Sequence, residues 1–74
     1  MLLPNPYKRL TYAKRCLVNL KTGSAFRGFI VSAPGSVVVL KAAQLIEPGA
    51  EPVDVQGEVL IEKANIDFIQ ITEV

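Results

Sequence analysis

The chain contains no histidine and no tryptophan, and its only cysteine is Cys16. Without histidine or a second cysteine, the residues that hold structural zinc or form a disulfide within the chain are missing. The serines have no basic partner, and the carboxylates are not paired on one strand face, so the groups needed for acid–base or nucleophilic catalysis are absent as well. The sequence therefore predicts a protein that is not an enzyme and that uses no metal or other cofactor.

Long apolar segments are also missing. Beyond the N-terminus, the longest apolar run covers residues 37–40, which is far too short to cross a bilayer. Two prolines and then Lys8 and Arg9 interrupt the apolar N-terminus, so the apolar core of a signal peptide is not present. We expect a soluble, cytoplasmic protein with no membrane partner, in which Cys16 is a small buried apolar group.

The chain has 74 residues, half of them hydrophobic, which fits one domain over residues 1–74. A domain of this size buries only about 60% of the surface that its unfolded chain exposes, so its core alone gives marginal stability. Because disulfides and zinc are excluded, association with further copies of the same chain is the remaining common source of stability. We therefore expect a homo-oligomer.

Charges of the two signs are separated along the sequence. All charged residues in positions 1–41 are basic, whereas the later ones are acidic, with Lys63 as the single exception. If strands from the two halves lie side by side, part of this charge is neutralised by cross-strand pairs. If identical subunits meet edge to edge, the two signs face each other across the joint and orient the subunits.

The pattern of polar and apolar residues predicts one short helix followed by five strands. The helix covers residues 6–15, with Asn5 as the N-cap and Pro6 in the first helical position. The strands cover residues 16–21, 25–32, 37–46, 58–61 and 66–72. Pro34 and Gly35 are expected at the centre of a type II turn. Residues 47–57, rich in proline, glycine and acids, are expected to form an exposed loop.

Gly28 interrupts the apolar pattern of the second predicted strand. A glycine inside a strand usually marks a sharp bend or a close approach by another backbone segment. Bent strands of this kind build a small barrel, so residues 16–72 are expected to form five strongly bent antiparallel strands. The last of these strands is apolar on both sides, which predicts that both sides are covered.

Two runs of the sequence resemble the signatures of the Sm and Sm-like (LSm) proteins. VNLKTGSAFRGFIV resembles the first signature through Gly23, Phe26 and Gly28, and VLIEKANIDFIQI resembles the second through Asn65. The resemblance implies an all-β small barrel with a short N-terminal helix. It also implies that the sheet is incomplete in one chain, and that the fourth strand pairs with the fifth strand of the next subunit to close a cyclic homo-oligomer.

The resemblance further implies RNA binding through two turns that line the pore of the ring. The first turn, residues 33–36, lacks the family's aspartate and stacking residue, and Glu62 and Lys63 stand where arginine and glycine are expected. An acid beside the pore repels phosphate. The usual uridine site is therefore incomplete, although Lys63 and Asn65 are still candidates to contact a ligand.

A basic helix that also carries aromatic residues offers a second surface for nucleic acid, because cations attract phosphates and aromatic rings stack on bases. Its candidate residues are Lys8, Arg9, Tyr12, Lys14 and Arg15, with Tyr7 as a further stacking surface. The same residues equally fit a solvated helix face with the tyrosines packed on the barrel. The leading interpretation is a ring that binds RNA or single-stranded nucleic acid without catalysis.

Two other functions remain open. A ring that organises proteins, with the helix and the acidic loop at residues 47–57 as docking surfaces, explains why the pore residues are lost. A monomeric barrel related to the SH3 module would bind a peptide in a groove. The absence of tryptophan and the scarcity of exposed aromatic residues argue against this last alternative.

Overall fold

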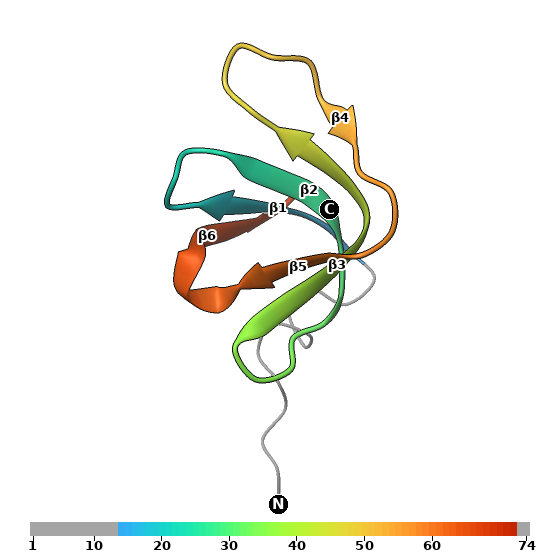
Figure 1. The fold of residues 1–74 in the computed structure, drawn as a ribbon, viewed down its shortest axis with the longest axis vertical. Helices are drawn as coiled ribbons and strands as arrows, with labels where there is room; N and C mark the ends of the chain where they lie inside the picture. Colours follow the sequence, from blue (N-terminus) through green and yellow to red (C-terminus); the bar gives the residue numbers. More distant parts are fainter. Residues whose placement is uncertain (1–13, 73–74) are drawn as a thin grey trace, which may run out of the picture.

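The structure is a computed structural model that describes residues 14–72 of the chain. These residues form one antiparallel sheet, drawn in Figure 1. Its elements are β1 (Arg15–Leu20), β2 (Ala25–Ser32), β3 (Val37–Ile46), β4 (Val53–Asp54), β5 (Val59–Glu62), the 3₁₀ turn η1 (Lys63–Asn65) and β6 (Ile66–Ile71). The prediction of an all-β, antiparallel, bent sheet is confirmed.

The bend of β2 and β3, clearly visible in Figure 1, lies where Gly28 faces β3. The register between the two strands shifts by one residue at this point, and Ala42 takes a positive φ of 52°, as in a β-bulge. A Cβ atom on Gly28 would lie 2.9 Å from the carbonyl oxygen of Lys41 and 3.1 Å from the Cα of Ala43. The predicted close backbone approach at Gly28 is therefore confirmed.

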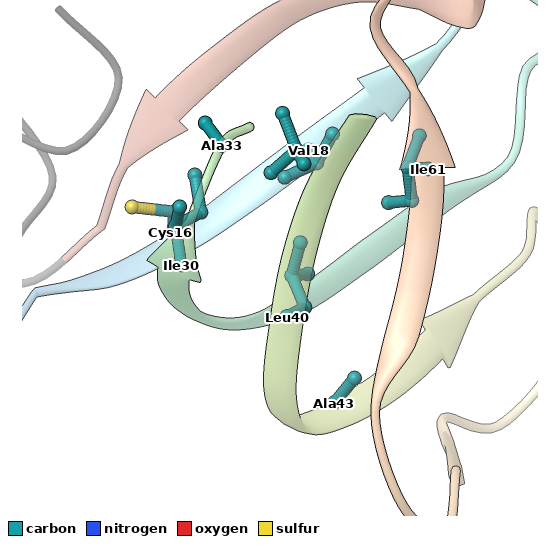
Figure 2. Close-up of a cluster of buried hydrophobic side chains, with 8 residues drawn as sticks. Cys16, Val18, Ile30, Ala33, Leu40, Ala43 and Ile61 are labelled. Carbon is teal, nitrogen blue, oxygen red and sulfur yellow. The ribbon is translucent and has the colours of Figure 1, made fainter. Parts of the chain in front are cut away.

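Apolar side chains from β1, β2, β3 and β5 meet inside the curve of the sheet (Figure 2). The buried cluster consists of Cys16, Val18, Ile30, Ala33, Val38, Leu40, Ala43 and Ile61. Cys16 has no exposed surface, and its Sγ lies 3.5 Å from the carbonyl oxygen of Lys14, so its predicted place as a small buried group is confirmed. Because strand side chains alternate between the two faces, the neighbours of these core residues point to the outer face of the sheet.

The sheet is open within one chain. Its strand order is β4-β3-β2-β1-β6. β5 and β4 lie along the same edge of β3, where β5 pairs with the first half of β3 and β4 with the second half. Among residues 14–72, β5 pairs only with β3 and β6 only with β1. The open sheet agrees with the expectation that the sheet is incomplete in one chain, whereas the predicted barrel of five strands is corrected to a sheet of six strands. The additional strand β4 lies inside the predicted loop at residues 47–57. It could not be predicted, because two residues are too few to show an alternating pattern.

The predicted helix at residues 6–15 lies outside the described residues except for its last two. Lys14 lies in a bend, and Arg15 is the first residue of β1. Arg15 pairs with Phe29 of β2, and its carbonyl oxygen accepts a hydrogen bond from the N–H of Thr72 at 3.0 Å. The helix prediction is therefore wrong at Arg15, because hydrogen bonds to both neighbouring segments hold this residue in the sheet.

The turn between β2 and β3 differs from the prediction by one position. The N–H of Val37 donates to the carbonyl oxygen of Pro34 at 3.1 Å, so Gly35 and Ser36 are the central residues. Gly35 has a φ of 54°, and a positive φ at the first central position is typical of type II′ turns, whose twist matches that of the flanking strands. The expected centre at Pro34 and Gly35 is wrong, because the hairpin geometry decides the register of the turn.

Candidate nucleic-acid interface

The turn at residues 33–36 and η1 lie next to each other. Glu62, the last residue of β5, pairs with Val37, the first residue of β3. The N–H of Lys63 donates to the carbonyl oxygen of Ser36 at 2.7 Å. Pairing of β3 with β5 therefore brings together the two turns that the family resemblance associates with RNA.

Lys63 joins these two turns through its side chain as well. Its Nζ donates to the carbonyl oxygen of Ala33 at 2.9 Å and to that of Gly35 at 2.7 Å. An ammonium group has three N–H donors, so two of the three bind the protein's own backbone. Charge-assisted hydrogen bonds are stronger than neutral ones. Lys63 thus holds the first turn against η1, and its predicted contact with nucleic acid stays a prediction.

Asn65 ends η1 at the surface. Its carbonyl oxygen accepts a hydrogen bond from the N–H of Lys21 at 2.9 Å, which ties the β1–β2 turn to η1. The side chain of Asn65 is exposed and makes no hydrogen bond with the other residues of the 14–72 segment. Its amide can both donate and accept, so it has the chemistry to contact a base edge. The nearby carboxylate of Glu62 is also exposed and adds negative charge.

Of the other predicted site residues, the structure describes Lys14 and Arg15. Arg15 lies on β1, where its guanidinium carbon is 5.5 Å from the centre of the Phe29 ring. The exposed residue Lys14 precedes it. The remaining candidates on the predicted helix, Lys8, Arg9 and Tyr12, lie outside the described residues, as does Tyr7. Of the predicted site residues within 14–72, only Lys63 and Asn65 lie in the same element, η1.

Sequence reasoning missed a polar chain across the β2–β3–β4 part of the sheet. Arg27 donates to Oε1 of Gln44 through Nε at 3.2 Å and Nη2 at 2.7 Å, and Nε2 of Gln44 donates to Oδ1 of Asp54 at 2.9 Å. Lys41 and Glu58 form an ion pair at 3.6 Å. Glu58 is the residue before β5, and the predicted pairing of charges across strands stays a prediction. The alternation of β2 places Arg27 on the outer face of the sheet, and this was the signal in the sequence that could have indicated a polar contact there.

Residues 14–72 contain no group of three or more histidine, cysteine, aspartate and glutamate side chains placed to hold a metal ion. The same residues form no helix with the length and apolar character required to cross a membrane.

No model of a known protein family matches the chain, and no curated protein matches it either. Among solved structures, the chain is similar to the Sm protein of Pyrococcus abyssii in complex with a uridine heptamer. The two have 32% sequence identity and a TM-score of 0.77, and the match covers 96% of this chain and 100% of the other. Identity at this level, together with the bent antiparallel sheet and the two signatures, shows that the chain belongs to the family of Sm and Sm-like proteins.

Proposed function

We propose that this Sm-like protein forms a cyclic homo-oligomer through β5 and β6 and binds single-stranded RNA without catalysing a reaction. The observation that carries the proposal is the similarity, over 96% of this chain, to an Sm protein whose structure was solved in complex with a uridine heptamer. Two features of this chain support it: the open edges of its sheet, and the two adjacent turns joined by Lys63.

The open edges support assembly because unpaired strands attract further strands. Among residues 14–72, β5 and β6 each use one edge only. Both strands also carry large exposed apolar side chains, with Leu60 66%, Phe68 52% and Ile71 42% exposed. Since β5 and β6 are different strands, pairing of one subunit's β5 with the next subunit's β6 is head-to-tail, and such pairing gives a ring when the rotation closes.

The adjacent turns support RNA binding in a form adapted to this sequence. Asn65 offers an exposed amide, and Lys63 holds the neighbouring turn in place. Glu62 adds a negative charge, which weakens the attraction for phosphate. We expect these turns to bind RNA with lower affinity than they would if residue 62 were arginine.

A ring that organises other proteins is the second candidate. The engagement of the Lys63 ammonium with Ala33 and Gly35, together with the exposed carboxylate of Glu62, favours it. Both features leave less positive charge for RNA at the turns.

Two measurements on the full chain test the proposal. Light scattering should give a mass of at least three times 8.0 kDa at micromolar concentration. Fluorescence anisotropy with labelled oligouridine, oligoadenine and oligothymidine should show saturable binding that weakens as salt rises. Replacement of Asn65 by alanine should weaken the binding, whereas Gln56→Ala, which removes an exposed amide between β4 and β5, should not.

The outcomes separate the candidates. A monomer at micromolar concentration contradicts the ring. A ring that binds none of the three oligomers, even at low salt, contradicts RNA binding and favours the protein-organising ring.

A further inference from the structure

Three residues with the chemistry to bind nucleic acid form a row across the outer face of the sheet. Arg15 of β1 pairs with Phe29 of β2, which in turn pairs with Lys41 of β3. Their strand neighbours Cys16 and Leu40 are buried in the core, and strand side chains alternate between faces. Arg15, Phe29 and Lys41, called the outer row below, therefore lie together on the opposite face.

Phe29, at the centre of the outer row, has a basic residue opposite it on each neighbouring strand. The guanidinium of Arg15 is 5.5 Å from the centre of the Phe29 ring, within the range of a cation–π contact. The Phe29 side chain is half-buried and does not pack against the hydrophobic core. Neighbouring strands lie about 5 Å apart, so the backbones that carry Arg15 and Lys41 are about 10 Å apart, with Phe29 between them.

Lys41 is accessible to a ligand. Its side chain is 60% exposed, and its partner Glu58 is 53% exposed at a distance of 3.6 Å. An exposed ion pair of this kind contributes little, because water and salt screen it. A phosphate group can therefore replace the carboxylate of Glu58 next to Lys41 at low cost.

The three strands that carry the outer row are basic. β1, β2 and β3 contain Arg15, Arg27 and Lys41 and no aspartate or glutamate. The strands that carry the outer row have both edges paired within the chain: β1 with β2 and β6, β2 with β1 and β3, and β3 with β2 and with β4 and β5. Assembly through the open edges of β5 and β6 therefore requires no backbone group of these three strands.

We infer that the outer row is a binding site for single-stranded nucleic acid, separate from the turns at residues 33–36 and 63–65. Arg15 and Lys41 contact phosphates, and the Phe29 ring stacks on a base, as on the aromatic platforms of sequence-tolerant single-strand binders. Stacking accepts every base, so the site does not select among U, A and T. The inference rests on the proposed function in taking nucleic acid as the ligand.

Binding of labelled oligouridine, oligoadenine and oligothymidine to the full chain tests the outer row at several salt concentrations. Arg15→Gln and Lys41→Gln should each weaken binding at least fivefold, and each should reduce the salt slope by about one unit. Lys21→Gln is the matched control, because it removes the same charge from the β1–β2 turn, and it should leave both values unchanged. Glu58→Gln should strengthen binding, because it releases Lys41.

Variants of Phe29 test the stacking contact. Phe29→Leu should weaken binding of all three oligomers by about tenfold, since base stacking on an aromatic ring is lost. Phe29→Tyr keeps the ring and should retain the affinity of the parent protein. This rescue distinguishes stacking from a loss of folding, and thermal unfolding of both variants shows whether the sheet is intact.

Each result supports or overturns the inference. If the parent protein binds the oligomers and the outer-row variants bind them equally well, the outer row is not a binding site. RNA binding by the protein still stands in that case. If the parent protein binds none of the oligomers, the proposed function itself fails. A third outcome is that polyglutamate, an acidic peptide, binds the parent protein and binds the outer-row variants more weakly, while the oligomers do not bind. In that case the outer row is a protein-binding site instead.

Discussion

The Lys63 ammonium donates a hydrogen bond to the carbonyl oxygen of Gly35 across 2.7 Å, which ties η1 to the turn that follows β2. The same ammonium reaches the carbonyl oxygen of Ala33, and the backbone N–H of Lys63 binds Ser36. One residue therefore makes three contacts with a turn from a distant part of the sequence. In this Sm-like protein, Lys63 thus holds the first turn against η1.

Replacement of Lys63 by methionine removes both ammonium hydrogen bonds while keeping an unbranched side chain. We expect a loss of about 1–2 kcal/mol in the free energy of unfolding, because the hydrogen bond to the buried residue Ala33 is lost, whereas the exposed Gly35 can replace its own with water. Urea unfolding measures this loss. Lys21→Met, at an exposed turn lysine, should change stability by no more than about 0.5 kcal/mol. Equal stability of the two variants would show that the turn does not depend on Lys63.

Substitution of alanine for Gly28 places a methyl group against the backbone of β3. The Cβ would lie 2.9 Å from the carbonyl oxygen of Lys41, and the backbone cannot move away without disturbing the bend. We expect destabilisation of about 1–3 kcal/mol, as for other overpacked sites, measured by thermal or urea unfolding. Gly57→Asn is the control, because that site has a positive φ and nothing within 4 Å, and asparagine tolerates this conformation.

Ala42 is the one non-glycine residue with a positive φ among those that the structure describes. Alanine pays a steric cost in this conformation, whereas glycine does not. Ala42→Gly should therefore raise the free energy of unfolding by about 0.5–1 kcal/mol. The same exchange at the exposed Ala64 of η1 should lower it, since no positive φ is relieved there. A midpoint for Ala42→Gly below that of the parent protein would contradict the strain at this bulge.

A charge on the open edge of β5 should prevent assembly. Leu60 is 66% exposed on this strand, so Leu60→Lys costs the monomer little and places an ammonium group in the proposed β5–β6 contact. We expect a fall in mass toward 8.0 kDa by light scattering. Val31→Lys alters an exposed apolar residue of β2, away from both open edges, and should leave the mass unchanged. A Leu60→Lys variant that keeps the parent mass at micromolar concentration would count against this interface.

Strand boundaries were predicted best where alternation and turn residues agree. The structure has β2 and β3 at residues 25–32 and 37–46, as predicted, and β6 starts at residue 66, as predicted. The other ends of the predicted strands shift by one residue. Gly28 was also interpreted correctly, because a glycine within an apolar strand has few explanations. Prediction failed for β4, which has two residues, and for Arg15, whose place in β1 depends on pairing with Phe29 and on the contact with Thr72.

The site was predicted less completely than the fold. Lys63 and Asn65 were identified by their place in a family signature, and the structure puts both in η1. The partners of Lys63 could not be predicted, because Ala33 and Gly35 are 30 and 28 residues away along the chain. The outer row could not be predicted from the sequence either. Alternation places Phe29 on the outer face, but only the register of three strands brings Arg15 and Lys41 to its sides.

Local chemistry in the sequence determined most of the strands and the bend at Gly28, and a single cysteine excludes a disulfide within the chain. The tertiary structure alone decided that Lys63 binds backbone carbonyl groups and that Arg15 and Lys41 lie opposite Phe29 on its two neighbouring strands. The physical reason is that alternation and turn preferences act over a few residues, whereas these contacts depend on the register of strands that are far apart in the chain.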